Sequence, residues 1–194
     1  MRKILLVIFM FFLVFIIYFL NRDTDIYILS IGDNFLNNSN FDSDIKNFFG
    51  KKLEKNVLYE ITGDYRVIDL INDIRDNKKF ISGGNEYTLN NSLIKADIIF
   101  ISIGINDFNY NKSDNFDYVD EVLSDLDKLL SLVRKYCKER IVIFYYNLDN
   151  DKLTNYVNGR LDRLATKYDI DIIDFSDNYN DLNTKIINYL DNLY

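Results

Sequence analysis

Three short polar segments follow apolar runs of the sequence and contain glycines, carboxylates and side-chain amides. They are Gly32-Asp33-Asn34, Gly63-Asp64 and Gly104-Ile105-Asn106-Asp107. Glycines permit sharp turns at strand ends, carboxylates serve as acids or bases, and a side-chain amide can contact a ligand or brace a loop. The three segments therefore predict one site, provided that the fold brings them together.

The absence of histidine and the single cysteine, Cys137, exclude several classes of chemistry. No Ser-His or Cys-His pair can form, and histidine-ligated zinc, non-haem iron and haem are excluded. Any general base must be a carboxylate, lysine or tyrosine with a displaced pKa. Cys137 continues an apolar helical stripe, so we interpret it as a core thiol. We predict neither a metal nor a cofactor.

The charge and composition describe one acidic globular domain. The 194 residues include 30 acidic and 23 basic side chains, for a net charge of −7, and 48% are hydrophobic. Nucleic-acid binding needs a basic face, and the body of the chain has no run rich in lysine or arginine. We therefore predict no nucleic-acid partner.

The first twenty residues are typical of a membrane segment. Arg2 and Lys3 precede an unbroken apolar run, 4–20, whose helix would span about 26 Å, close to the hydrocarbon thickness of a bilayer. A cleaved signal peptide is the alternative, but this run lacks the small residues of a cleavage site. We predict an anchor over 1–21 with a cytoplasmic N-terminus, and an extracytoplasmic domain over 22–194.

The body of the chain alternates between strand-like and helix-like patterns. Uninterrupted apolar runs predict five strands buried on both faces, at 26–31, 57–61, 97–103, 141–146 and 170–175. Helical periodicity predicts five helices, at 41–53, 67–74, 119–133, 153–164 and 186–190. Repeated strand–helix units indicate an α/β fold with a parallel sheet and helices on both sides, whose ligands bind beyond the carboxyl ends of the strands.

In order and spacing, these segments resemble the SGNH (GDSL) hydrolase family over nearly all of residues 25–193. That family has G-D-S with the nucleophilic serine, a glycine after the second strand, G-x-N-D after the third, and D-x-x-H near the C-terminus. The most specific match is 96–107, a strand that ends in Gly-Ile-Asn-Asp. The resemblance implies a three-layer α/β/α architecture with a five-stranded parallel sheet of order 2-1-3-4-5.

The resemblance also implies roles for the residues that match. The Gly63 N–H and the Asn106 amide correspond to the oxyanion-hole donors of the family. Supporting positions are Gly32, Asp33, Gly104 and Asp107. For Asn106, contact with a ligand and bracing of a loop remain alternatives.

The catalytic positions themselves are substituted. Asn34 stands where the family has its serine, and an amide nitrogen cannot attack an ester. Asn178 takes the aspartate position and Asp181 the histidine position, or Asp177 is the acid if the alignment shifts by one residue. Loss of triad members costs about 10⁴- to 10⁶-fold in turnover.

We therefore predict a membrane-anchored SGNH hydrolase-like protein without catalysis, which binds an acylated glycan or an envelope protein. The alternatives are an active ester hydrolase or acyltransferase with a rearranged site, and a purely structural spacer. Ser30, the nearest hydroxyl, lies within a strand and is interpreted as buried. We interpret 82–85 as a turn, and the aspartates near the loops as helix caps and turn residues in preference to Ca²⁺ or Mg²⁺ ligands.

Overall fold

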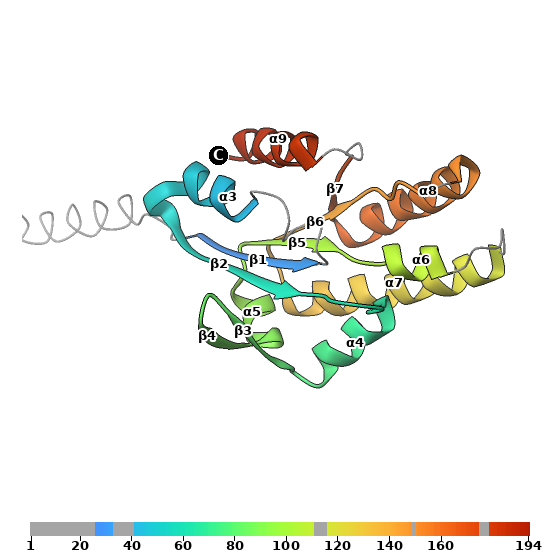
Figure 1. Ribbon diagram of the computed structural model, residues 1–194, viewed down its shortest axis with the longest axis horizontal. Helices are drawn as coiled ribbons and strands as arrows, with labels where there is room; N and C mark the ends of the chain where they lie inside the picture. The colour runs from blue at the N-terminus through green and yellow to red at the C-terminus, as the bar shows by residue number, and fades with distance from the viewer. Residues whose placement is uncertain (1–25, 33–40, 111–115, 149, 175–178) are drawn as a thin grey trace, which may run out of the picture.

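The computed structural model describes residues 26–32, 41–110, 116–148, 150–174 and 179–194; for 109, 110 and 179–181 it describes the backbone alone. A five-stranded sheet lies at the centre (Figure 1). Its strands are all parallel, in the order β2-β1-β5-β6-β7. They are β1 (Ile26–Gly32), β2 (Leu53–Glu60), β5 (Ile98–Ser102), β6 (Arg140–Phe144) and β7 (Asp171–Ile173). The predicted parallel sheet and its order are confirmed.

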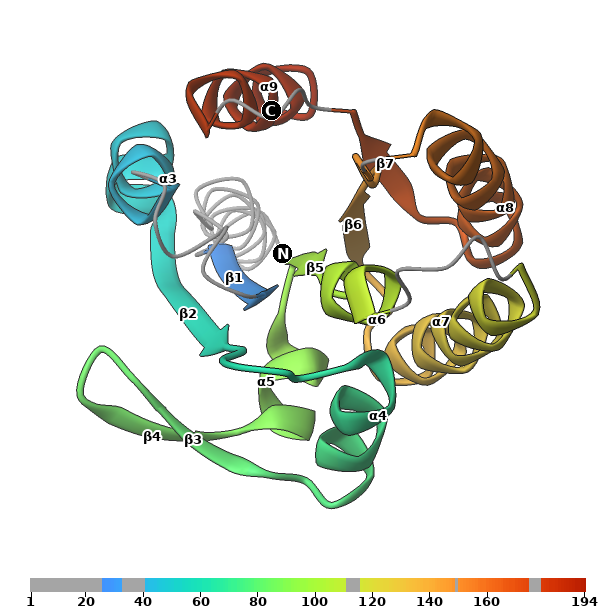
Figure 2. The same ribbon diagram turned by 45° about the vertical axis from the view of Figure 1, so that its right-hand side comes forward.

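Helices cover both faces of this sheet (Figure 2). One face packs against α4 (Val67–Arg75), α5 (Leu89–Lys95), α7 (Phe116–Tyr136) and α8 (Asp151–Tyr168). The other face packs against α3 (Phe41–Phe49) and α9 (Tyr179–Asp191). The short helix α6 (Ile105–Tyr110) follows β5 directly. The predicted three-layer α/β/α architecture is therefore observed.

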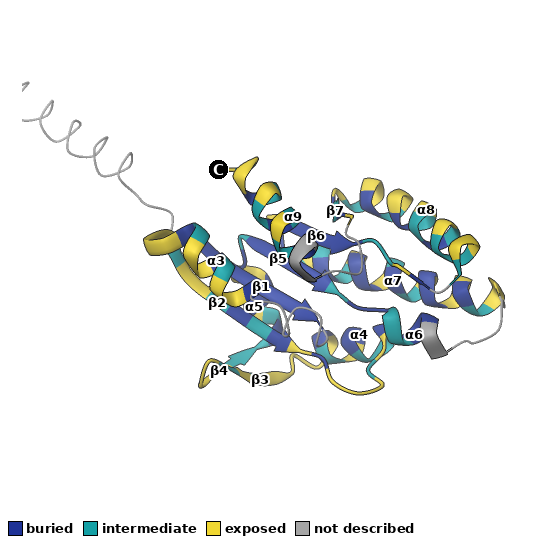
Figure 3. Cartoon of the chain, turned by 45° about the horizontal axis from the view of Figure 1, so that its top comes forward, coloured by how far each residue is buried: buried dark blue, intermediate teal, exposed yellow. Residues whose placement is uncertain are grey.

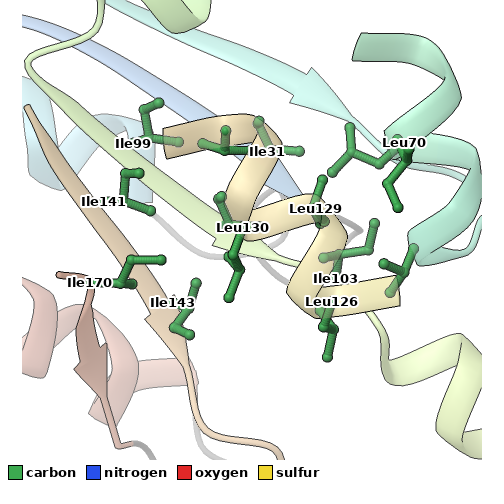
Figure 4. Packing of buried hydrophobic residues seen from close by; sticks show 14 of the residues in the cluster. Ile31, Leu70, Ile99, Ile103, Leu126, Leu129, Leu130, Ile141, Ile143 and Ile170 are labelled. Carbon is green, nitrogen blue, oxygen red and sulfur yellow. The ribbon is translucent and has the colours of Figure 1, made fainter. Parts of the chain in front are cut away.

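The core lies on both sides of β1, which is buried along its whole length (Figure 3). Because successive side chains of a strand point to opposite faces, Ile28 packs toward α3 and α9 while Leu29 and Ile31 pack toward α7. Figure 4 shows Ile31 with Ile99, Ile141 and Leu130 on the α7 side. An uninterrupted apolar strand is what two covered faces require.

The structure corrects several predicted boundaries. Leu53, predicted at the end of a helix, begins β2, because Gly50 turns the chain with a φ of +51° and a 3₁₀ turn, η1 (Gly50–Lys52), follows. The segments α5 and α6 were not predicted as helices. Tyr145 and Tyr146, predicted within a strand, lie after β6.

A hairpin that was not predicted lies beside β2. It consists of β3 (Lys79–Ser82) and β4 (Asn85–Thr88), which pair antiparallel. The predicted turn at 82–85 is its tip, where Gly83 and Gly84 have φ values of +55° and +78°. Two consecutive residues with positive φ make the tight turn that matches the twist of a hairpin.

The described residues contain no helix that is long and apolar enough to cross a membrane. The predicted anchor, 1–21, lies outside them, so it stays a prediction.

Candidate functional site

The carboxyl ends of β1, β2 and β5 lie side by side at one edge of the sheet, as the strand order requires. Gly32, the last residue of β1, pairs in register with Glu60 of β2 and with Ser102 of β5. The Ile61 N–H donates to the Gly32 carbonyl at 2.7 Å, so β2 and β1 stay paired up to the loops. This edge, formed by the carboxyl ends of the three strands, is the candidate site.

Asn106 joins two of these loops through its side-chain amide. Nδ2 donates to the carbonyl oxygen of Gly63 at 3.0 Å and to that of Tyr65 at 3.1 Å. Both partners are acceptors, so the nitrogen must face them, and an amide nitrogen carries only two hydrogens. The amide of Asn106 is therefore fully engaged in bracing the loop between β2 and α4.

Asp107 fixes the same loop from the other side. Its Oδ2 accepts a hydrogen bond of 3.1 Å from the N–H of Val67, the first residue of α4. A carboxylate at a helix N-terminus satisfies a free N–H and complements the helix dipole. Burial raises the pKa of Asp107, although the Val67 N–H and the charge of Arg66 act to lower it.

Gly104 begins the turn into α6 and lies against Tyr146. Its φ is +103°, in the region that favours glycine, and a Cβ at this position would lie 2.7 Å from the Tyr146 hydroxyl oxygen. That hydroxyl donates to the Ile103 carbonyl at 2.6 Å, and the ring meets Phe108 edge-on with centroids 4.8 Å apart. Tyr146 therefore fills the space beside the turn that carries Asn106.

Tyr146 is itself held by Asn158 of α8. The Asn158 Oδ1 accepts from the Tyr146 N–H, and its Nδ2 donates to the Tyr146 carbonyl, each at 2.9 Å. A side-chain amide thus takes both main-chain groups that a longer strand would have paired. This explains why β6 ends at Phe144.

Tyr65 links the loop to a polar cluster on α4. Its hydroxyl donates to Asp73 Oδ2, which also accepts from the Tyr59 hydroxyl at 2.5 Å and from Lys78 Nζ at 2.9 Å. Burial acts to raise the pKa of Asp73, but the bonds from the two tyrosines and Lys78 outweigh it and lower that pKa. The loop whose carbonyls Asn106 contacts is therefore also held to α4 through the side chain of Tyr65.

The structure does not describe the substituted catalytic positions. Asp33, Asn34 and Asn178 lie outside the described residues, and the side chain of Asp181, in α9, is not described. Their predicted roles stay predictions, as do those of Gly63 and Asn106 in holding an oxyanion. Among the side chains that the structure describes, no three carboxylates or thiols gather as metal ligands.

The hydroxyl and thiol groups near the site can be placed. Ser30 is 1% exposed inside β1, so its interpretation as buried is confirmed, and its hydroxyl has no hydrogen-bond partner among the described residues. Cys137 is buried with its thiol 3.7 Å from the Ala96 carbonyl, as expected for a core residue. Ser102, which the sequence pattern did not single out, is a half-buried hydroxyl at the site edge, beside Gly32.

Neither a protein-family model nor a curated protein matches this sequence. Solved structures do match. An acetyl xylan esterase from the rumen bacterium Butyrivibrio proteoclasticus superposes with a TM-score of 0.56 at 14% identity, over 85% of this chain. A candidate platelet activating factor protein from Streptococcus pneumonia superposes with a TM-score of 0.51 at 22% identity, over 77% of this chain. A gut microbial diltiazem-metabolizing enzyme superposes with a TM-score of 0.50 at 12% identity, over 78% of this chain.

The chain has an SGNH/GDSL hydrolase-like fold. It spans 63%, 66% and 37% of the lengths of those three proteins, respectively. At such low identities the similarity establishes the architecture, and the chemistry has to be argued from the site.

Proposed function

We propose that the chain is a membrane-anchored, extracytoplasmic SGNH hydrolase-like protein that does not hydrolyse esters and instead binds an acylated glycan of the cell envelope. Residues 4–20 form the anchor, and 22–194 form the binding domain. The edge formed by the carboxyl ends of β1, β2 and β5 is the binding site.

The engaged amide of Asn106 is the observation that carries the loss of catalysis. An oxyanion-hole donor contributes about 10²- to 10³-fold to turnover only if its hydrogen points at the developing charge. Both Nδ2 hydrogens of Asn106 are directed at loop carbonyls, 3.0 and 3.1 Å away. Asn34 at the serine position and the lack of histidine act in the same direction.

The choice of ligand follows from chemistry and architecture together. One protein with this fold is an acetyl xylan esterase. A site that retains that architecture without a nucleophile would hold an acylated sugar and leave it uncleaved. An acylated glycan is therefore our preferred ligand, ahead of an envelope protein.

Hydrolysis is tested with the full-length chain and p-nitrophenyl acetate. We expect the wild-type rate to equal those of an Asn34→Ala variant and a heat-denatured sample. We expect activity to rise only when Asn34→Ser and Asp181→His are combined, because triad members act as a unit.

The Asn106→Ala variant separates the two roles of this residue. If it braces the loop, the variant loses about 1–3 kcal/mol of stability, from two hydrogen bonds, while the background rate stays unchanged. A wild-type rate above the controls that falls about 10²-fold in Asn106→Ala would instead establish an active hydrolase. Circular dichroism confirms that the variant remains folded.

Glycan binding is tested by calorimetry with acetylated xylo-oligosaccharides and the same oligosaccharides after deacetylation. We expect the acetylated form to bind more tightly. Equal binding of both forms, or binding of neither, contradicts the proposed ligand.

A further inference from the structure

One edge of the sheet has surface features that the candidate site does not explain. It is the edge at which the strands begin, opposite the site, and is called the strand-start edge here. Lysines stand just before three strands: Lys51 and Lys52 before β2, Lys95 before β5, and Lys138 before β6. In Figure 1 the C-terminus, α5 and the start of β2 lie at this end of the molecule, away from α6.

Two large apolar side chains are exposed at the same edge. Ile94, next to Lys95 at the end of α5, is 61% exposed, and the C-terminal residue Tyr194 is 67% exposed. The Tyr194 ring contacts Phe49 edge-on at 5.4 Å, which places it beside the start of β2. Helix-dipole complementarity accounts for lysines after helices but not for exposed apolar groups.

The length of chain before β1 limits how far this edge can lie from a membrane. The apolar run of the predicted anchor ends at Leu20 and β1 begins at Ile26, so five residues connect them. Five residues span at most about 18 Å when fully extended. Because the strands are parallel, all five begin at this tethered edge, and the tether brings the whole edge close to the bilayer.

Both edges of the sheet carry charges of both signs. Lys51, Lys52, Lys95 and Lys138 form no ion pair with another described residue. Glu54, Asp97, Glu139 and Asp169 lie at the same edge, and Asp97 and Glu139 are close enough to the Tyr194 hydroxyl to act on its pKa. The opposite edge presents exposed carboxylates at Asp64, Asp151 and Asp174 beside the exposed cations Arg66 and Lys152. An anionic bilayer attracts lysines near its surface and repels a face of carboxylates.

From these features we infer that the strand-start edge rests on the surface of the bilayer, with Ile94 and Tyr194 at the headgroups and the lysines on anionic phosphates. This inference relies on the anchor in the proposed function. The seven residues of β1 then raise the site about 23 Å above the contact surface. The site therefore faces away from the membrane, toward an envelope polymer and not toward a bilayer lipid.

Depth-dependent quenching in liposomes tests this orientation with the full-length chain. Ile94→Cys and Tyr194→Cys each carry an environment-sensitive fluorophore, and the liposomes contain doxyl-labelled lipid with phosphatidylglycerol and phosphatidylcholine. Wild type treated with the same thiol-reactive fluorophore serves as the blank. It should take up no label, because the thiol of Cys137 is buried. Ile81→Cys is the matched control. Ile81 is 76% exposed, but it lies on the flank of β2 and away from the strand-start edge, because the hydroxyl of its neighbour Ser82 accepts a hydrogen bond from the Leu58 N–H.

We expect quenching of at least about twofold at positions 94 and 194, since groups at an interface lie within the headgroup region. Position 81 and an Asp151→Cys probe at the site edge stay unquenched. Quenching at 94 and 194 weakens in liposomes of phosphatidylcholine alone. The ratio of molecules whose strand-start edge touches the bilayer to those whose edge does not should fall about fivefold for each lysine that loses its anionic partner.

Two controls separate failure of this inference from failure of the anchor. If alkaline carbonate extracts the chain from membranes, the anchor is wrong and the proposed function fails with it. If the chain is retained but 94 and 194 are no more quenched than 81 and 151, only the resting edge is refuted. Equal quenching in both lipid mixtures refutes the role of anionic headgroups.

Discussion

The contact between Gly104 and Tyr146 gives a quantitative test of how the candidate site is built. A Cβ at position 104 would lie 2.7 Å from the Tyr146 hydroxyl oxygen and 3.3 Å from Cζ, on a backbone with φ of +103°. The positive φ costs an alanine about 1–2 kcal/mol. Overpacking in a filled space costs about 1–3 kcal/mol more. We therefore expect Gly104→Ala to lower the free energy of unfolding by about 2–5 kcal/mol.

A double-mutant cycle isolates the steric part. Tyr146→Phe removes the oxygen that a Cβ would meet first, together with the 2.6 Å hydrogen bond to the Ile103 carbonyl. Alone it costs about 0.5–1.5 kcal/mol, the net value of one hydrogen bond. In the double variant the clash is partly relieved, so we expect Gly104→Ala to cost about 1 kcal/mol less than in the wild type.

Unfolding in urea, followed by far-ultraviolet circular dichroism and tyrosine fluorescence, measures these differences, since the chain has no tryptophan. Gly63→Ala is the matched control, because Gly63 has a φ of +67° but nothing within 4 Å of its added Cβ. It should show only the strain of about 1–2 kcal/mol. Equal costs for the two alanine variants, or additivity in the cycle within about 0.5 kcal/mol, would refute the packing of Tyr146 against Gly104.

Two further predictions concern acid stability and α8. Because burial raises the pKa of Asp107 above 3.8, its ionisation destabilises the folded state, so the stability of Asp107→Asn relative to wild type should rise with pH from 3.8 toward the folded pKa. Hydrogen bonds lower the pKa of Asp73 despite its burial, so ionised Asp73 stabilises the fold above pH 3.8, and this stabilisation is lost as the pH falls through the folded pKa. Asp73→Asn should therefore be less stable than wild type above pH 3.8 and lose that difference in acid. Equal changes of stability with pH for the Asp107→Asn and Asp73→Asn variants, measured by urea unfolding in acid, would contradict these two pKa directions. Gly159 lies inside α8 with open space around it, so Gly159→Ala should raise stability by about 0.5–1 kcal/mol, and a lower melting temperature would show that the helix needs the glycine.

The sequence predicted the sheet well because its strands are buried on both faces. A run such as Ile26–Ile31 contains one polar residue, Ser30, and no alternation, and this pattern has few other interpretations. The hairpin and α5 were missed because they are short and half polar. Leu89–Lys95 holds three apolar residues in seven, too few for a period, and each hairpin strand has four residues. The signal for the hairpin is the Gly83-Gly84 pair between Phe80-Ile81 and Tyr87-Thr88, residues that favour strands.

The meeting of the three strand ends at the candidate site was also predictable, since strand order alone brings the carboxyl ends of β1, β2 and β5 to one edge. The direction of the Asn106 amide was not, because either a ligand or a loop carbonyl can satisfy the same group. Nor did the sequence indicate that Asn158 would take the main-chain groups of Tyr146 and so end β6. Contacts of this kind depend on the crossing of α8 over the strand ends, a tertiary feature without a local pattern.

The bonds around α6 give the most specific motif of the chain a structural role that needs no substrate. Gly104 makes room for Tyr146, Asn106 holds two carbonyls of the neighbouring loop, and Asp107 caps α4. Each interaction stabilises the junction of β5 with α4 whether or not a substrate is present. The motif therefore has a structural use in this fold that is independent of catalysis, and the predicted roles of Asn34 and the C-terminal block are what the hydrolysis assay tests.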